Sequence, residues 1–307
     1  MSKKAKGNIL LLITALIWGS AFVAQSVGID AIGPYAYNLY RNIIAFVVMI
    51  PVCLFFRKRE NKQNPRTEAE WTAINIRSVK AGILVGIVLF VASTLQQLGM
   101  VTTSAGKAGF ITALYIVMVP ILGLFIKKKT AGSVWVAVIV ALVGFYLISV
   151  TEGFVVAKGD AICFLGAVCF AVHILVIDHA SEKEIDGVLM SCVQFLVAAI
   201  LSIAPSLLWD TISWHSVVIT IVPILYSGVL SSGVGYTLQI IAQKDTDPTV
   251  ASLLLSLESV FAAIFGFLLL HEILSTRELI GCALVFFAVI IVQIPMPEKE
   301  KKGQAPM

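Results

Sequence analysis

Residues 8–27 read NILLLITALIWGSAFVAQSV, a run of 20 residues that contains no charged side chain. About 20 apolar residues in a helix are enough to cross a bilayer core of ~30 Å. The rest of the chain has the same character, since 59% of its 307 residues are hydrophobic and 13% are charged. Soluble globular proteins typically carry about 25% charged residues. Lipid is therefore the expected solvent for most of this chain.

Nine further runs resemble the first in length and composition. The ten expected transmembrane helices cover residues 8–27, 35–56, 81–98, 108–126, 133–150, 161–177, 188–209, 217–243, 249–270 and 276–294. These runs are too long and too continuous for the strands of a membrane β-barrel. Residues 57–80 are expected to form the one long loop, and residues 295–307 a disordered cytoplasmic tail. The sequence predicts an all-α membrane protein with ten transmembrane helices.

The basic residues predict the orientation of these helices. If the N-terminus is cytoplasmic, 18 of the 22 Lys and Arg residues fall on the cytoplasmic side, three fall outside, and Arg41 lies within a span. Cytoplasmic loops of membrane proteins carry such an excess of Lys and Arg. We therefore expect a multi-pass protein of the cell (plasma) membrane with both termini in the cytoplasm.

The two halves of the chain resemble each other. The matching positions are Lys6-Gly7-Asn8 with Lys158-Gly159-Asp160, Leu95-Gln96 with Leu238-Gln239, Tyr115 with Glu258, Gly123 with Gly266, and Lys129-Thr130 near Glu272-Ile273. The Tyr115 and Glu258 pair and the Gly123 and Gly266 pair share one offset of 143 residues. Residues 1–150 and 158–294 are thus expected to be two five-helix repeats. Because five is odd, the second repeat must enter the membrane from the opposite face, which is the inverted arrangement of many secondary transporters.

Several short motifs in both halves resemble one known family. They are Ala15-Leu16-Ile17-Trp18-Gly19-Ser20-Ala21-Phe22, Arg41-Asn42-Ile43-Ile44-Ala45, Ser256-Leu257-Glu258-Ser259-Val260-Phe261-Ala262-Ala263, Leu270-His271-Glu272 and Leu279-Ile280-Gly281. With them, nearly the whole chain is similar to the EamA branch of the drug/metabolite transporter superfamily. The resemblance implies a ten-helix basket with spans 1, 3, 4, 6, 8 and 9 around a central cavity. It also implies export or uptake of amino acids or similar metabolites.

One position departs from the pattern of that family. Ser259 follows the glutamate of span 9, where many relatives carry proline, whereas span 4 retains Pro120. Proline is a common cause of helix kinks. The sequence therefore predicts that span 9 is straighter than in those relatives.

Polar side chains within the spans are the candidates for lining the cavity, because such groups are costly in lipid. The large ones are Trp18 in span 1, Gln97 in span 3, and Tyr236 and Gln239 in span 8. Tyr115 is a further candidate as the counterpart of Glu258, and His173 in mid-span 6 aligns with Ala21 of span 1. The alternative for each is a packing role between helices. We assign these six residues to the substrate pathway.

Glu258 is the most informative of the candidates because it is a carboxyl group near mid-membrane. Desolvation there favours its neutral form unless a cation is close. Glu258 is therefore expected to line the substrate pathway and either to couple proton movement to transport or to bind a cationic part of the substrate. The alternatives are an ion pair with Arg41, which enters from the outer face to a similar depth, and a simple hydrogen bond between helices.

The motifs of other function classes are missing from the sequence. There is no HExxH, no Gly-x-Ser-x-Gly and no GxxxxGK[ST], which argues against an intramembrane enzyme and against ATP-driven transport. The five cysteines show no metal-binding spacing, and the basic residues sit in short clusters between apolar runs. Neither a cofactor, a metal ion nor a nucleic acid is expected.

The predicted function is secondary active transport of small metabolites such as amino acids, by export or exchange, and coupling to protons is one of the expectations. A drug or cation efflux carrier is the alternative, followed by a channel. The expected partners are a small-molecule substrate and the lipid bilayer. A homodimer is compatible with the sequence, which does not decide the oligomeric state.

Overall fold

The computed structural model of the chain describes residues 3–103, 105–128, 132–149, 158–270 and 275–293. The first five spans are α1 (Lys3–Ile32), α2 (Pro34–Gln63), α3 (Glu68–Met100), the pair α4 (Ala105–Ala113) and α5 (Tyr115–Phe125), and α6 (Gly132–Ser149). The last five are α7 (Lys158–Ser181), α8 (Gly187–Trp209), the run α10 (Ile221–Leu225), η1 (Tyr226–Tyr236) and α11 (Thr237–Gln243), the pair α12 (Pro248–Leu255) and α13 (Glu258–Leu270), and α14 (Thr276–Gln293). A short helix, α9 (Trp214–Ile219), precedes span 8. The predicted features at residues 129–130, 271–273 and 295–307 lie outside the described residues.

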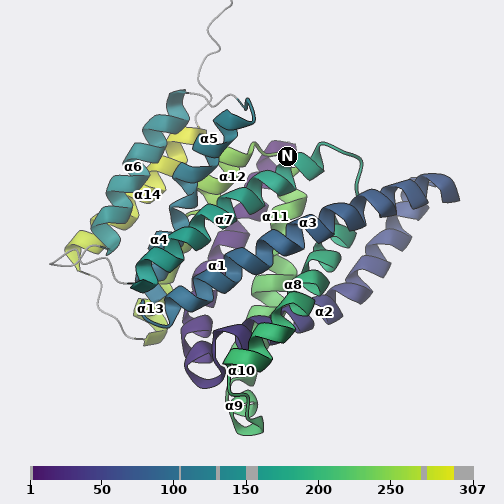
Figure 1. Ribbon diagram of the computed structural model, residues 1–307. Coiled ribbons are helices and arrows are strands. Elements are labelled where there is room, and N and C mark those ends of the chain that lie inside the picture. The colour runs from purple at the N-terminus through teal and green to yellow at the C-terminus, as the bar shows by residue number, and fades with distance from the viewer. Residues whose placement is uncertain (1–2, 104, 129–131, 150–157, 271–274, 294–307) are drawn as a thin grey trace, which may run out of the picture.

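All ten predicted spans are present as helices in one bundle (Figure 1). In the described part of the chain, eight helical segments are long and apolar enough to cross a membrane. The apolar parts of α6 and α14, Gly132–Leu147 and Leu279–Ile291, are shorter. Large apolar side chains such as Phe125 and Leu207 face outwards, whereas polar groups of most spans are buried. This distribution is expected when the surrounding solvent is lipid.

The prediction of a long loop at residues 57–80 is wrong. α2 continues to Gln63 and α3 begins at Glu68, so the connection is only a few residues long. A capping box between Thr67 and Glu70 starts α3. The ends of both helices project beyond the rest of the bundle (Figure 1). Outside the bilayer, water hydrogen-bonds to polar side chains, so a helix there can consist of polar residues.

The two halves pack against each other in equivalent ways. α1 packs along α13 and α7 packs along α5, so the first helix of each half lies on span 4 or span 9 of the other half. α2 packs along α8, and α6 lies beside α14 (Figure 1). These pairs are the ones that a twofold relation between the halves requires.

Two matched glycines show the same relation at atomic detail. A Cβ on Gly7 of α1 would lie 2.5 Å from Oγ1 of Thr246. A Cβ on Gly159 of α7 would lie 2.5 Å from Oγ1 of Thr103. Gly7 and Gly159 are counterparts at the start of each half, and Thr103 and Thr246 are separated by the repeat offset of 143 residues. The close approach of the two halves at each end of the bundle thus uses equivalent residues.

Spans 4 and 9 are both broken at the same repeat position. The Leu114 amide donates to the Ile111 carbonyl at 3.2 Å, and the Leu257 amide donates to the Leu254 carbonyl at 3.3 Å. These are i to i−3 bonds, tighter than those of an α-helix. α5 then begins at Tyr115 and α13 at Glu258, which are counterparts. Discontinuous helices of this kind form the binding sites of many inverted-repeat transporters.

Span 9 is thus interrupted without a proline, while its straightness relative to other family members stays a prediction. Three serines of span 9 donate their hydroxyl hydrogens to carbonyls three residues earlier, a kind of back-bonding that is associated with bent helices. The donors are Ser252, Ser256 and Ser259, at 2.8, 2.8 and 2.9 Å.

Span 8 contains an 11-residue π-helix, η1, in its central part. Its widened turn allows close contact with α1, since a Cβ on Gly235 would lie 2.5 Å from Nε1 of Trp18. The Trp18 indole donates to the Ser231 carbonyl at 3.0 Å, and the Thr14 hydroxyl donates to the Gly235 carbonyl at 3.3 Å. π-Helical turns are frequent at functional sites. This one brings span 8 against the polar face of span 1.

Candidate functional site: the central cavity

A small cavity of about 30 Å³ lies inside the bundle. It is lined by Trp18, Phe22, Gln25, Arg41, Gln96, Thr112, Tyr115, Phe170, Ser231, Tyr236 and Glu258. Spans 1, 3, 4, 6, 8 and 9 all contribute, as the family resemblance implies, and α2 adds Arg41. A volume of 10–15 Å³ is about what one water molecule needs. In this conformation the cavity holds water-sized groups and is too small for a metabolite.

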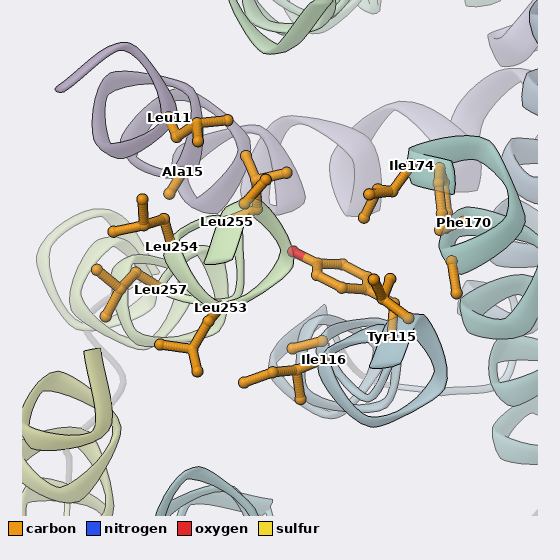
Figure 2. Packing of buried hydrophobic residues seen from close by; sticks show 14 of the residues in the cluster. Leu11, Ala15, Tyr115, Ile116, Phe170, Ile174, Leu253, Leu254, Leu255 and Leu257 are labelled. Atoms are coloured by element: carbon orange, nitrogen blue, oxygen red, sulfur yellow. The ribbon is translucent and has the colours of Figure 1, made fainter. Parts of the chain in front are cut away.

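Tyr115 and Glu258 meet at this cavity. The Tyr115 hydroxyl donates to Oε1 of Glu258 at 3.0 Å, and both side chains are buried. Figure 2 shows the Tyr115 ring reaching from α5 towards α12, with Phe170 and Ile174 of α7 on its other side. Because each residue opens the second half of a broken span, the hydrogen bond joins the two breaks.

Arg41 is held away from Glu258 by other partners. Its Nη1 donates to Oε1 of Gln25 at 2.9 Å, and its Nε donates to the Ser232 hydroxyl at 3.1 Å. Gln97 donates to the same Gln25 oxygen. An ion pair between Arg41 and Glu258, one of the alternatives for the glutamate, is therefore not formed in this structure, whereas the hydrogen bond between helices is. Gln25 takes the place of the carboxylate because it lies on the face of α1 that Arg41 approaches.

A buried charge without a counter-charge is the main electrostatic feature of the cavity. Arg41 is 3% exposed and Glu258 is 3% exposed. Among the residues that the structure describes, neither forms an ion pair. Isolated charges in a low-dielectric interior are costly, so they normally have partners. The cavity thus offers a cationic group and a carboxyl group on separate walls.

Aromatic rings form another wall. The Trp18 and Tyr236 rings lie 4.6 Å apart between centroids. His173 meets the Tyr236 ring edge-on at 5.6 Å, and its Nε2 is 3.3 Å from Oε1 of Gln194. His173 itself does not line the cavity. It lies behind Tyr236 and supports that ring.

Two predicted glutamines also lie outside the cavity lining. Gln97 is buried against Gln25, while its neighbour Gln96 faces the cavity and donates to the Thr112 hydroxyl at 3.0 Å. One residue rotates a side chain by about 100° around a helix, so the two neighbours face different surroundings, and a role of Gln97 in the substrate pathway stays a prediction. Gln239 is the repeat counterpart of Gln96, and its buried Oε1 has no hydrogen-bond donor in the described part of the chain.

The structure thus brings five of the predicted residues to one cavity: Trp18, Arg41, Tyr115, Tyr236 and Glu258. It adds others that the sequence analysis did not select, namely Phe22, Gln25, Gln96, Thr112, Phe170 and Ser231. Gln25 could have been found, because it shares a helical face with Thr14 and Trp18. Phe22 and Phe170 carry no such signal, since phenylalanine is common throughout the spans.

Comparisons with known proteins agree with this architecture. The profile of the EamA-like transporter family matches residues 5–150 and again residues 157–294. An uncharacterized transporter of Archaeoglobus fulgidus is 32% identical over 95% of this chain and 87% of its own length. The uncharacterized transporter YwfM of Bacillus subtilis is 26% identical over 98% of each chain.

More distant similarities extend to plants and to solved structures. A WAT1-related chloroplast protein of Arabidopsis thaliana is 23% identical over 93% of this chain and 69% of its own length. A crystal structure that is 16% identical superimposes with a TM-score of 0.71 over 94% of this chain and 96% of the other, which supports the ten-helix fold. With its two family matches and its multi-pass membrane fold, the chain belongs to the EamA-like transporter family and is a membrane transporter.

Proposed function

We propose that the protein is a secondary active transporter that moves small zwitterionic metabolites, such as amino acids, by alternating access. The observation that carries this proposal is that Arg41 and Glu258, two buried ionisable groups with hydrogen-bond partners but no counter-charge among the described residues, lie on separate walls of one cavity. A zwitterion supplies a carboxylate for Arg41 and an ammonium group for Glu258. Binding would then compensate two desolvated groups at once.

The aromatic and amide groups complete such a site. Trp18 and Tyr236 offer ring faces to an apolar or cationic part of the substrate. Gln25 and Gln96 offer amide groups that discriminate by hydrogen bonding. In this proposal the substrate replaces the contact between Gln25 and Arg41, which at present satisfies the guanidinium group.

Glu258 is assigned a second role as the coupling group. When the substrate leaves, the glutamate loses its cation, and a proton is the smallest replacement. Tyr115 orients the carboxyl oxygen through its hydroxyl. A carboxyl group that exchanges a proton for a substrate cation links the two fluxes, so a proton gradient drives export of the metabolite.

Alternating access is assigned to the broken spans. The cavity has to enlarge to admit a metabolite, and the breaks at Leu114 and Leu257 are the weak points of spans 4 and 9. Because the two breaks are counterparts in oppositely directed repeats, opening one half exposes one side of the membrane. We place the protein in the plasma membrane with both termini in the cytoplasm, on the strength of its basic residues.

The experiment has two stages. Purified protein is first screened for thermal stabilisation by a metabolite library, because a ligand that binds only the folded form raises the melting temperature. The stabilising compound is then tested for counterflow in proteoliposomes. When the vesicles are loaded with unlabelled compound, a carrier takes up labelled compound from outside in exchange for it, whereas a channel shows no such exchange. Absence of counterflow for every stabilising compound would refute the proposal.

A second candidate is efflux of organic cations, and it is favoured by the aromatic residues around Glu258. Cations bind to the faces of Trp and Tyr rings. The buried Arg41 opposes this function because it repels a second cation in a small space. Stabilisation by quaternary amines that lack a carboxylate, together with no response to amino acids, would favour the cation carrier.

A further inference from the structure

A second and larger hollow lies on the flank of the bundle, away from the central cavity. It has a volume of about 910 Å³ and is lined by residues of α3, α5 and α7 and of the connection after α7. α7 packs against both α3 and α5, and it lies between them in Figure 1. The two hollows share no lining residue. We refer to this hollow as the flank groove.

The part of the flank groove that lies along the apolar stretches of the helices is itself apolar and exposed to lipid. Leu84 of α3, Phe125 of α5, Ile126 just after α5, and Val172 of α7 line it. Phe125 is 82% exposed and Leu84 is 51% exposed. Side chains of this kind on a transmembrane helix face hydrocarbon. This part of the groove therefore offers a surface that suits an apolar chain better than a water-soluble metabolite.

The end of the flank groove at the membrane–water boundary is basic. Arg77, Lys80, Lys128 and Lys183 line it with His179, and Glu182 is the one acidic residue among the lining side chains. Lys80 marks the point at which the apolar stretch of α3 begins, so these cations sit at the boundary between membrane and water.

Only part of this positive charge is neutralised by the protein. Lys128 pairs with Asp178 and Glu182, and Arg77 lies 3.6 Å from a carboxylate oxygen of Glu184. Within the described ranges, Lys80 and Lys183 form no ion pair. Both are exposed. The end of the groove thus keeps two cations for an external anion.

We propose that the flank groove is a binding site for an anionic phospholipid. The phosphate lies at Lys80 and Lys183, and an acyl chain follows Leu84, Phe125 and Val172. Basic pockets between transmembrane helices at the membrane boundary bind anionic head groups in this way. The combination of an apolar channel and a cationic end matches both parts of one lipid molecule. Neither a soluble anion nor a neutral lipid satisfies both.

The flank groove is formed by helices from both repeats. α3 and α5 belong to the first half and α7 to the second, so a lipid in the groove contacts both halves at once. A bound lipid therefore stabilises the arrangement in which these helices are packed as they are here. This inference does not depend on the substrate or on the direction of transport.

The test compares lipids of equal chain length on the purified protein in neutral detergent. Binding of dioleoylphosphatidylglycerol and dioleoylphosphatidylcholine is measured by native mass spectrometry and by the shift in melting temperature. We expect the parent protein to prefer phosphatidylglycerol. In the double variant Lys80→Gln, Lys183→Gln, the ratio of affinities for phosphatidylglycerol and phosphatidylcholine should fall about 25-fold, or about fivefold for each lysine.

Three controls make the result decisive. The matched double variant Lys58→Gln, Lys62→Gln removes two exposed lysines of α2 outside the groove and should retain the preference. The charge-conserving variant Lys80→Arg, Lys183→Arg should also retain it. Val172→Trp should weaken binding of both lipids by filling the channel.

The outcomes that overturn the proposal are also distinct. Equal loss in both double variants would show a general surface effect. Equal stabilisation by inorganic phosphate would show an anion site without a lipid. Equal binding of the two lipids by the parent would remove the role of the head group. A dimer that excludes lipid from the groove would make a second copy of the chain its occupant.

Discussion

The Tyr115 hydroxyl donates a 3.0 Å hydrogen bond to Glu258, and these two residues are separated by 143 positions, the offset that relates the two halves of the chain. A residue that contacts its own counterpart lies on the axis between the halves. The same backbone position thus carries a phenol in one half and a carboxyl group in the other. This difference in chemistry breaks the symmetry of the site and gives it a group that can exchange a proton.

Replacement of Glu258 by glutamine should uncouple transport from protons. Glutamine keeps the size of the side chain and an oxygen for the Tyr115 hydroxyl, but it does not titrate near neutral pH. We expect exchange between labelled and unlabelled substrate to persist, while accumulation driven by a pH gradient falls at least tenfold. Both rates are measured in proteoliposomes over pH 5.5–8. An unchanged pH profile would remove the coupling role of Glu258.

Tyr115→Phe is the matched control for that experiment. It removes the donor to Glu258 and leaves the carboxyl group and the aromatic packing in place. We expect coupling to survive with an altered pH dependence, because the hydrogen bond orients the carboxyl group and does not carry the proton. Complete loss of coupling in both variants would assign Tyr115 to the proton path itself.

Arg41→Gln should discriminate between ligands by their carboxylate. If the guanidinium group binds the carboxylate of a zwitterion, affinity for such a ligand falls about 10- to 100-fold, since a charged hydrogen bond contributes about 1.5–3 kcal/mol. Affinity for the corresponding amine without a carboxylate should change little. Isothermal titration with both compounds measures the difference. Equal losses would mean that Arg41 acts on the structure and not on the ligand.

Gly19→Ala should destabilise the contact between α1 and α13. A Cβ on Gly19 would lie 2.4 Å from Cβ of Phe261 and 2.7 Å from the Glu258 carbonyl oxygen. Overpacking of this kind costs about 1–3 kcal/mol. Gly106→Ala is the control, because no atom of the described residues outside its own stretch of helix lies within 4 Å of its Cβ position. We expect Gly19→Ala to melt at a lower temperature than the parent and Gly106→Ala to melt at the temperature of the parent. Equal melting temperatures of the two variants would contradict the close helix contact.

Asp210 after α8 should stabilise the start of α2. Its Oδ2 accepts a 2.6 Å hydrogen bond from the Ala36 amide, one of the free amides in the first turn. Asp210→Ala should therefore cost about 1 kcal/mol, and Asp210→Asn only a few tenths, because asparagine also accepts such bonds. Thermal unfolding of the two variants in detergent tests this. Equal stability of the parent and Asp210→Ala would exclude the capping role.

The same aspartate predicts a pH dependence. Burial raises the pKa of Asp210 above its ordinary value of 3.8, against the opposing effect of the backbone hydrogen bonds from Ala36 and Tyr35. The folded protein thus binds this proton more readily than the unfolded chain. Its contribution to stability is present in full below pH 3.8 and is lost as pH rises through the folded-state pKa. The melting temperature of the parent relative to Asp210→Asn should fall as the pH rises from 3.8 through the folded-state pKa, and a rise would contradict the sign.

The spans and the repeat could be predicted because each depends on local composition or on simple alignment. Apolar length locates a span, and the shared offset of Tyr115 and Glu258 places them at equivalent positions. The contact between these two residues follows only from the structure. Nothing in the sequence indicates that Arg41 bonds Gln25 and Ser232, because their approach depends on how α1, α2 and η1 pack.

The errors have physical causes that can be named. Residues 57–80 are polar and were expected to be a loop, but polarity excludes a segment from lipid and does not prevent a helix in water. The break in span 9 lies among serines whose hydroxyls bond to carbonyls three residues earlier, and a search for proline alone does not detect it. Gln96, and not Gln97, faces the cavity. When a helix is buried on several sides, its sequence locates the cavity-facing side only to within about one residue.

The inverted relation of the two halves underlies the whole mechanism and can be tested by accessibility. Lys3 begins α1 and Lys158 begins α7, the equivalent helix of the second half. Lys3→Cys and Lys158→Cys are made separately after the five native cysteines are replaced, and each is labelled with a membrane-impermeant maleimide from either side. The inverted arrangement predicts that Lys3→Cys reacts from the cytoplasmic side and Lys158→Cys from the outside. Labelling of both from one side would contradict it.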